Sequence, residues 1–182
     1  MQPNIAIFYG STTCYTEMAG EKIQQTLQKQ LGDINIPMFD IKEHALEKSQ
    51  QFDVIIFGIS TWDFGELQED WESTWEDIKS LQLAGKTVAL YGLGDQLGYA
   101  DWFQDALGML HDELVILDCE LVGYWPNTGY EFTASKALTE DQQFFVGLSL
   151  DDENQFDQSD ERIQQWCQQL AEELGNAQLS PY

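Results

Sequence analysis

Three stretches of almost continuous apolar residues mark the first half of the chain, each bounded by polar or glycine-containing segments. They are Ile5–Tyr9, Asp53–Ser60 and Lys86–Leu93. Such strands are typical of a parallel sheet with helices on both faces, because neither face has to present polar side chains to water. A further segment, Ile34–Met38, alternates apolar and polar positions and contains Pro37. This pattern predicts a second strand, at an edge of the sheet.

Helical periodicity separates these predicted strands. Apolar residues recur three to four positions apart after the first, third and fourth strands and again near the end of the chain. A short helix is also expected around Ala45 and Leu46, and Ser159 is predicted to cap the last helix. The longer periodic sets are Ala19, Ile23, Leu27 and Leu31; Trp71, Trp75 and Ile78; Trp102, Ala106, Leu107 and Leu110; and Ile163, Trp166, Cys167, Leu170 and Leu174.

The segment between the last two predicted helices is less regular. A fifth strand is expected within Leu114–Tyr124, and Phe144–Leu150 is predicted to form one further buried strand. The polar and aromatic residues up to Gln143 follow no steady period. Strands that alternate with helices indicate the α/β class, here one doubly wound domain over residues 1–175 with a frayed tail at residues 176–182.

The charge of the chain restricts its partners. Its 182 residues include 32 Asp and Glu but only 8 Lys and Arg, which gives a formal net charge of −24. A surface this acidic repels nucleic-acid phosphates and anionic membranes, so a basic protein is the expected partner. Aromatic residues make up 13 % of the chain, which provides the apolar surface that a folded core requires.

Cysteine and histidine usage gives no sign of a disulfide framework or a metal site. Cys14, Cys119 and Cys167 are odd in number and far apart, and His44 and His111 are isolated. These spacings do not match a zinc site. The chain starts without a secretory pattern and has no apolar run near the ~20 residues that span a bilayer. We therefore expect a soluble protein of the reducing cytoplasm.

The first candidate binding loop, residues 11–16, follows the first predicted strand and opens a helix. Ligands of doubly wound folds bind beyond the carboxyl ends of the strands. Hydroxyl groups and backbone N–H groups at a helix start can hold a phosphate without a cation. The loop has neither the lysine of a Walker loop nor a GxGxxG pattern, which favours a single phosphomonoester over a nucleoside triphosphate or a dinucleotide. The alternative is an ordinary turn rich in Ser and Thr.

Two more loops are expected at the same edge of the sheet. Residues 60–66 carry Trp62 and Phe64, and residues 92–99 carry three glycines and Tyr99. Aromatic side chains can hold a flat ring between them while a few directed polar groups bind its rim. The alternative is that Trp62 and Phe64 are ordinary core residues.

Taken together, these loops resemble those of the flavodoxin family. The first, STTCYT, is similar to the phosphate loop, and the other two, STWDFGELQEDW and YGLGDQLGYADWFQDALG, are similar to the loops that bind the flavin ring. The resemblance extends through VGYWP, FVGLSLDDENQ and DERIQQWCQQL, and is strongest to long-chain enterobacterial members. It implies a flavodoxin-like doubly wound sandwich. Its five-stranded parallel sheet would have helices on both faces, and an insertion at about Trp125–Gln143 would interrupt the fifth strand.

The resemblance also implies FMN as a non-covalently bound cofactor. The hydroxyl and amide groups of the first loop would bind its phosphate, and Trp62 and Tyr99 would enclose its ring. Asp95 would face the pyrimidine edge, with Gln104 close to it and Asp151 near the ribityl chain. The complete set of expected cofactor-binding residues is Ser11, Thr12, Thr13, Cys14, Tyr15, Thr16, Ser60, Thr61, Trp62, Asp63, Phe64, Gly65, Gly92, Leu93, Gly94, Asp95, Tyr99, Gln104 and Asp151.

Two residues depart from the usual family pattern. Cys14 stands where the phosphate loop normally has glycine, so a positive φ there would be strained. Leu93 replaces a threonine of the third loop and removes a hydroxyl group. A thiol at a helix start can be reactive, but a neighbouring phosphate raises its pKa, and a space-filling role for Cys14 is the favoured interpretation.

The function implied by the resemblance is that of a low-potential carrier of single electrons, not an enzyme. Its partners would be a basic NADPH-dependent flavodoxin reductase and acceptor redox enzymes, bound transiently by a cytoplasmic monomer. Two alternatives stay open at this point. One is an FMN-dependent quinone reductase on the same fold, and the other is an acidic binding protein that has lost its flavin.

Overall fold

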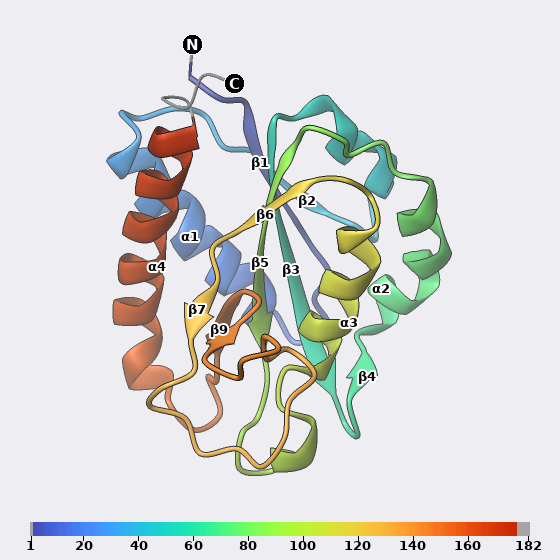
Figure 1. Cartoon of the computed structure of the whole chain (residues 1–182), viewed down its shortest axis with the longest axis vertical. Helices are drawn as coiled ribbons and strands as arrows, with labels where there is room; N and C mark the ends of the chain where they lie inside the picture. Colours follow the sequence, from blue (N-terminus) through green and yellow to red (C-terminus); the bar gives the residue numbers. More distant parts are fainter. Residues whose placement is uncertain (1, 178–182) are drawn as a thin grey trace.

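The computed structural model describes residues 2–177 and shows a parallel sheet with helices on both faces (Figure 1). The strands of its main path lie in the order β2-β1-β3-β5-β6, and each neighbouring pair is parallel. The chain moves from β1 outward to β2 and then returns to β3 on the other side of β1, so the winding reverses there. The bounds are Ile5–Tyr9 for β1, Met38–Asp40 for β2, Val54–Trp62 for β3, Thr87–Leu93 for β5 and Glu120–Val122 for β6.

Strand β5 has two different partners along one edge. Its first residues, Thr87–Ala89, pair with β6, and its last residues, Tyr91–Leu93, pair with β9 (Leu148–Leu150). The short strand β4 (Glu66–Leu67) pairs antiparallel with the end of β3. The sheet therefore has seven strands, and not the five expected from the sequence.

The segment between β6 and β9 forms a small separate ribbon. It consists of β7 (Trp125–Pro126) and β8 (Phe144–Phe145), which pair antiparallel. The insertion expected at about Trp125–Gln143 falls within this segment. The prediction of one continuous strand at Phe144–Leu150 is wrong, because its two ends belong to two different sheets.

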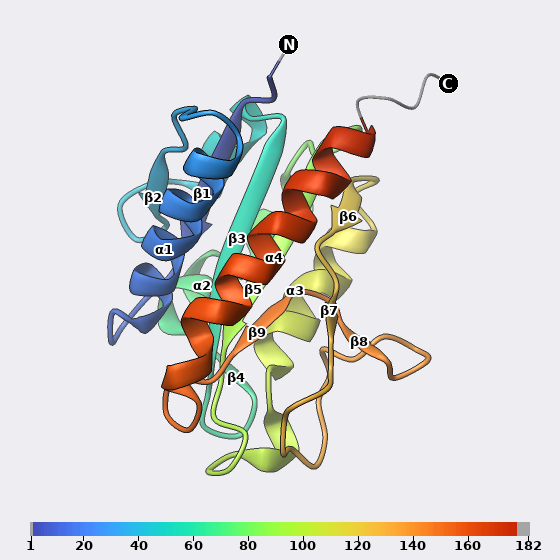
Figure 2. The ribbon, with the colours of Figure 1, turned by 90° about the vertical axis from the view of Figure 1, so that its left-hand side faces the viewer.

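The helices form one layer on each face of the sheet. Helices α1 (Tyr15–Gln30) and α4 (Phe156–Ala177) pack side by side on one face. Helices α2 (Glu69–Thr74) and α3 (Asp105–Val115) cover the other, as the two views show (Figures 1 and 2). Three 3₁₀ helices join these elements: η1 (Leu46–Gln51), η2 (Trp75–Ser80) and η3 (Ala100–Trp102).

Two details of the predicted elements are wrong. Strand β2 begins at Met38, so Ile34–Pro37 precede it although Ile36 is fully buried. Pro37 has no N–H to give to a ladder and contributes only its carbonyl, which accepts from the Ile7 N–H. Helix α4 begins before Ser159, whose hydroxyl lies inside the first turns and donates to Asp152 instead of capping the helix.

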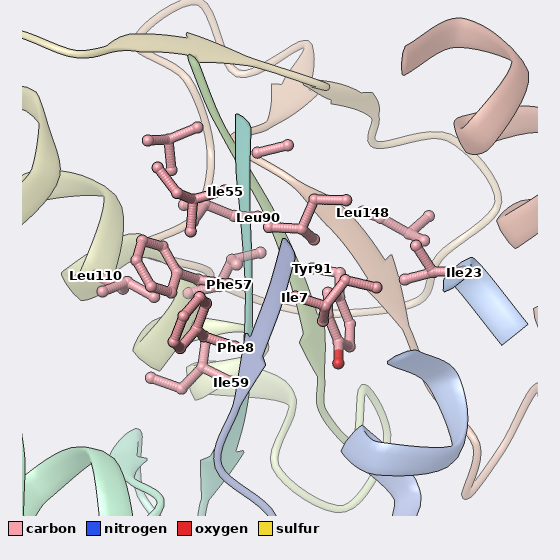
Figure 3. Close-up of a cluster of buried hydrophobic side chains, with 14 of the residues drawn as sticks. Ile7, Phe8, Ile23, Ile55, Phe57, Ile59, Leu90, Tyr91, Leu110 and Leu148 are labelled. Carbon is pink, nitrogen blue, oxygen red and sulfur yellow. The ribbon is translucent and has the colours of Figure 1, made fainter. Parts of the chain in front are cut away.

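Alternate residues of the strands fill two apolar layers (Figure 3). Phe8 of β1 and Phe57 of β3 lie opposite each other, with ring centroids 6.1 Å apart, on the side of α3. Ile7 and Tyr91 point the other way, toward α1. All four side chains are buried. The near-continuous apolar runs of the sequence thus reflect two buried faces.

The carboxyl end of the chain extends α4 beyond the predicted domain boundary. Asn176 and Ala177, expected in the frayed tail, are the last residues of the helix, and residues 178–182 lie outside the described part of the chain. Within residues 2–177, every helix is too short or too polar to cross a membrane.

Two glycines in helices should respond oppositely to alanine. A β-carbon on Gly108 of α3 would collide with the backbone of Lys136 and Ala137, whereas one on Gly175 of α4 would meet nothing within 4 Å. Gly108→Ala should lower the free energy of unfolding by about 1–3 kcal/mol, because backbone cannot move aside as a side-chain end can. Gly175→Ala should raise it by about 0.5–1 kcal/mol through helix propensity. Urea unfolding measures both changes. A lower free energy of unfolding for Gly175→Ala, or a higher one for Gly108→Ala, would contradict this packing.

Candidate functional site

The first candidate loop, residues 11–16, joins the end of β1 to the start of α1. Helix α1 begins at Tyr15, and Cys14 precedes it without a side-chain cap. The first N–H groups of a helix have no partner within it. The Ser11 hydroxyl is also buried without a hydrogen-bond partner. An unpartnered hydroxyl beside free helix N–H groups suits an anion.

The second candidate loop follows β3 and is shorter than expected, because the strand extends further along the chain. Ser60, Thr61 and Trp62 are the last residues of the strand, and Trp62 pairs with Glu66 across a tight hairpin. The Trp62 indole Nε1 donates to Ser60 Oγ at 2.9 Å. Thr61 Oγ1 accepts the backbone N–H of Ala106 at 3.0 Å, which ties the start of α3 to this strand.

Asp63, Phe64 and Gly65 form the tip of this hairpin. Asp63 and Gly65 have positive φ angles of 42° and 85°, and Gly65 packs against Asp105. Phe64 is 67 % exposed and lies edge-on to Trp102, with ring centroids 5.0 Å apart. The interpretation of Phe64 as a core residue is therefore wrong.

The third candidate loop, which follows β5, is held by its own carboxylate. Asp95 Oδ1 accepts the N–H groups of Leu97 at 3.1 Å and Gly98 at 2.7 Å, and also the side-chain amide of Asn154 at 2.7 Å. The Tyr99 hydroxyl donates to Asp63 Oδ1 at 3.4 Å, which links the tips of the second and third loops. The aromatic rings of these two loops are thus positioned by polar contacts.

The three loops surround one cavity of about 280 Å³ at the carboxyl ends of the strands. Eleven of the predicted site residues line it together with Asp152 and Glu153, which the sequence reasoning missed. Trp62 lines this cavity and is only partly buried, so it is not an ordinary core residue. The lining residues are Thr13, Tyr15, Thr16, Ser60, Thr61, Trp62, Asp63, Leu93, Gly94, Asp95, Tyr99, Asp152 and Glu153.

Eight predicted site residues are not among those that line the cavity. Three of them, Gly92, Gln104 and Asp151, take part in buried hydrogen bonds that hold the third loop and the strand ends. Gln104 is fully buried, and its Nε2 donates to the carbonyls of Gly92 and Leu150, both at 3.1 Å, while its Oε1 has no partner. It holds the ends of β5 and β9 together. The eight are Ser11, Thr12, Cys14, Phe64, Gly65, Gly92, Gln104 and Asp151.

Asp151 supports the third loop from the end of β9. Its carboxylate is fully buried and accepts the backbone N–H of Gln96 at 3.1 Å and the Gln96 side-chain Nε2 at 2.7 Å. Gln96 in turn accepts the backbone N–H of Glu131. The buried acid therefore faces protein groups, and the next two residues, Asp152 and Glu153, are the ones that reach the cavity.

The cavity is acidic. Four of its described lining residues are Asp or Glu, and none is Lys or Arg. Burial raises the pKa of Asp152 above the usual range, although a hydrogen bond from Ser159 opposes this shift. An anionic group in this cavity has to bind through hydroxyl and N–H donors, and negative charge added elsewhere in it is disfavoured.

Comparison with known proteins shows similarity to one family over most of the chain. The family model for flavodoxin matches residues 7–166. The chain is 56 % identical to Flavodoxin 2 of Salmonella typhi and 55 % identical to Flavodoxin 2 of Escherichia coli K12, over 94 % of this chain and 96 % of each relative. The chain belongs to the flavodoxin family.

A solved structure supports the fold of this flavodoxin-family chain. The crystal structure of Fusobacterium nucleatum flavodoxin bound to flavin mononucleotide matches with a TM-score of 0.86 and 26 % identity, over 94 % of this chain and 99 % of that one. Flavodoxins are electron-transfer proteins and not enzymes. The quinone reductase and the flavin-free binding protein are not favoured by these comparisons.

Cys14 is the one unusual feature of the first loop. It is exposed, and its φ of 68° lies in the left-handed region, where a residue with a β-carbon is strained. All three cysteines are free thiols in the structure. This is the strain expected where Cys14 replaces the usual glycine.

Cys14→Gly should raise the free energy of unfolding of the flavin-free protein by about 0.5–1 kcal/mol. Relief of left-handed strain, worth about 1–2 kcal/mol, exceeds the entropy that glycine adds to the unfolded chain, about 0.5–1 kcal/mol. Urea denaturation measures the change. Cys14→Ala keeps the β-carbon and should bring no gain, so equal stability of all three proteins would show that the strain has no energetic weight.

Proposed function

We propose that this chain binds FMN non-covalently in the three-loop cavity and carries single electrons between redox proteins. The observation that carries the proposal is the cavity itself, in which the aromatic side chains of Trp62 and Tyr99 meet the residues at the start of α1. The family relationship and the FMN-bound neighbour agree with it. When bound, FMN supplies a ring that accepts and releases electrons one at a time.

The residues of the first loop fit the phosphate of FMN. Ser11 Oγ is a buried donor without a partner, which a phosphate oxygen would satisfy. Thr13, Tyr15 and Thr16 of the same loop line the cavity, and the N–H groups that open α1 add further donors. Thr12 would contribute through its hydroxyl and its backbone N–H, and Cys14 through the loop backbone. A site built from neutral donors and a helix start needs no lysine.

The second and third loops fit the flavin ring. Trp62 and Tyr99 would pack on the ring, and Asp63, Leu93, Gly94 and Asp95 line the space beside it. Ser60 and Thr61 would hold the indole and the start of α3 in place. Gly92, Gln104 and Asp151 act beneath the loops, whereas Phe64 and Gly65 form the tip of the hairpin. The four lining carboxylates disfavour negative charge on a reduced ring, which supports a low potential.

Ser11→Ala should weaken FMN binding about tenfold or more and leave riboflavin binding unchanged. A hydrogen bond to a charged group contributes about 1.5–3 kcal/mol, and riboflavin lacks the phosphate that receives it. Quenching of flavin fluorescence on titration of the flavin-free protein measures both affinities. Ser49 is also a buried hydroxyl without a partner, but it lies in η1, so Ser49→Ala is the matched control. Equal wild-type affinities for FMN and riboflavin would contradict the phosphate site.

The partners that we propose are a basic NADPH-dependent reductase and acceptor redox enzymes, bound transiently by a cytoplasmic monomer. Six carboxylates lie on the second and third loops and on the helices that follow them, and two of these, Asp63 and Asp95, line the cavity. A ring of one charge steers an oppositely charged protein and raises its rate of encounter more than its affinity. These carboxylates are Asp63, Glu66, Glu69, Asp70, Asp95 and Asp101.

Reversal of three exposed charges from this set, Glu66, Glu69 and Asp101 to Lys, should slow reduction by the reductase severalfold at low salt. The difference should shrink at ~1 M salt, where the Debye length is about 3 Å. Stopped-flow kinetics of flavin reduction measures the rate. The control reverses Glu43, Glu47 and Glu120, which change the net charge equally but lie outside the three loops and outside the cavity lining. Equal salt dependence of the two triple variants would place the docking surface elsewhere.

A further inference from the structure

Gln68 connects two of the three loops that form the proposed FMN site. It follows β4 directly and is the residue before α2, and its side chain is 1 % exposed. Its Nε2 donates to Thr12 Oγ1 of the first loop at 3.1 Å and to Asp70 Oδ2 at 2.7 Å. Its Oε1 accepts the backbone N–H of Trp71 at 3.3 Å. One buried amide therefore starts helix α2 and also reaches the candidate phosphate loop.

The partners of this amide fix which way it points. The backbone N–H of Trp71 can only donate, so it must face the oxygen of Gln68. The ionised Asp70 carboxylate can only accept, so it must face the nitrogen. The nitrogen therefore also faces Thr12, whose hydroxyl oxygen serves as the acceptor. The hydroxyl proton of Thr12 consequently points away from Gln68 and remains available to another acceptor.

The space for this contact exists because residue 10 is glycine. A β-carbon on Gly10 would collide with Gln68 Oε1 and would lie 2.8 Å from Cδ1 of Trp71. The indole of Trp71 is fully buried and donates to the Gly58 carbonyl at 2.9 Å, and the N–H of Gly10 donates to the same carbonyl at 3.3 Å. Gln68 and Trp71 thus form a rigid support directly against the backbone where the first loop begins.

We propose that Gln68 is a positioning residue for the phosphate end of the cofactor site. By donating to Thr12 Oγ1, it orients the Thr12 hydroxyl as a donor toward a bound phosphate, and it fixes the first loop to the hairpin that carries Trp62. The inference rests on the proposed function, because it assumes that residues 11–16 receive the phosphate of FMN. Gln68 itself does not line the cavity, and its effect passes through Thr12.

The test compares two ligands that differ only in the phosphate. Gln68→Asn shortens the side chain by one methylene, so it loses the reach to Thr12 while asparagine remains a favoured residue before a helix. The flavin-free variant should bind FMN about tenfold more weakly than the wild type and should bind riboflavin equally well. Gln68→Met removes both polar ends and should show the same selective loss. Flavin fluorescence quenching gives the affinities, and thermal unfolding reports whether each variant is folded.

A double-mutant cycle with Thr12 separates this role from general support of the fold. If Gln68 acts through the Thr12 hydroxyl, Gln68→Asn combined with Thr12→Ala should lose no more preference for FMN over riboflavin than Thr12→Ala alone. The matched control is Gln24→Asn on α1, whose amide donates to the Ile36 carbonyl at 2.6 Å, away from the cavity. The control should leave the ratio of the two affinities at the wild-type value.

The outcomes distinguish this inference from the proposed function. If the wild type binds FMN no more tightly than riboflavin, the phosphate site of the proposed function fails and the role of Gln68 fails with it. If the wild type prefers FMN and Gln68→Asn keeps the full preference, only the role of Gln68 is overturned. Equal weakening of both ligands would also overturn it, since it would reveal a support for the whole cavity rather than for the phosphate loop.

Discussion

The position of α1 over the sheet depends on one buried hydrogen bond. The Tyr91 hydroxyl in the interior strand β5 donates to the Thr16 carbonyl in the first turn of α1 at 2.8 Å. Burial raises the pKa of Tyr91 well above its usual value, so the hydroxyl keeps its proton and remains a donor. Its ring crosses the neighbouring strand at Gly58 and ends beside Gly20 of α1, where side chains would collide with it. The end of the candidate phosphate loop, where α1 begins, is therefore fixed to strand β5 of the sheet.

The third loop depends in the same way on contacts that are distant in sequence. Gln96 is buried between Asp151 at the end of β9 and the backbone of Glu131, and Gln104 holds the ends of β5 and β9 together. Each contact satisfies a buried polar group that would otherwise cost about 1–3 kcal/mol. The cavity is thus formed by short loops whose shapes are set by buried amides and carboxylates behind them.

The parts that could be predicted from the sequence are those with a local cause. The apolar runs of β1, β3 and β5 and the helical spacing of Ile23 and Leu27 record burial directly, and they place three loops at one edge. The predicted strand at Phe144–Leu150 was wrong because apolar character does not say which sheet a residue joins. The prediction that Ser159 caps the last helix was wrong, because its hydroxyl donates to Asp152 from inside the helix.

The cavity was predicted best where a loop directly follows a strand. Asp152 and Glu153 were missed because their neighbour Asp151 is the residue that turns inward, and no periodic signal tells adjacent acids apart. Gln68 was missed for a related reason. Its partner Thr12 lies far away along the chain, and a lone glutamine before a helix carries no local pattern that reveals a tertiary contact.

The division of β5 between two partners has a consequence for the order in which the protein folds. Thr87 pairs with Glu120, whereas Tyr91 pairs with Leu148, much farther along the chain. Closing a longer loop costs more chain entropy and depends on more of the polypeptide being in place. The amino-terminal half of this edge can form from the nearer segment alone, but the half that bears the third loop has to wait for β9. The part of this edge that carries the third loop is therefore the part that needs the longer loop closure.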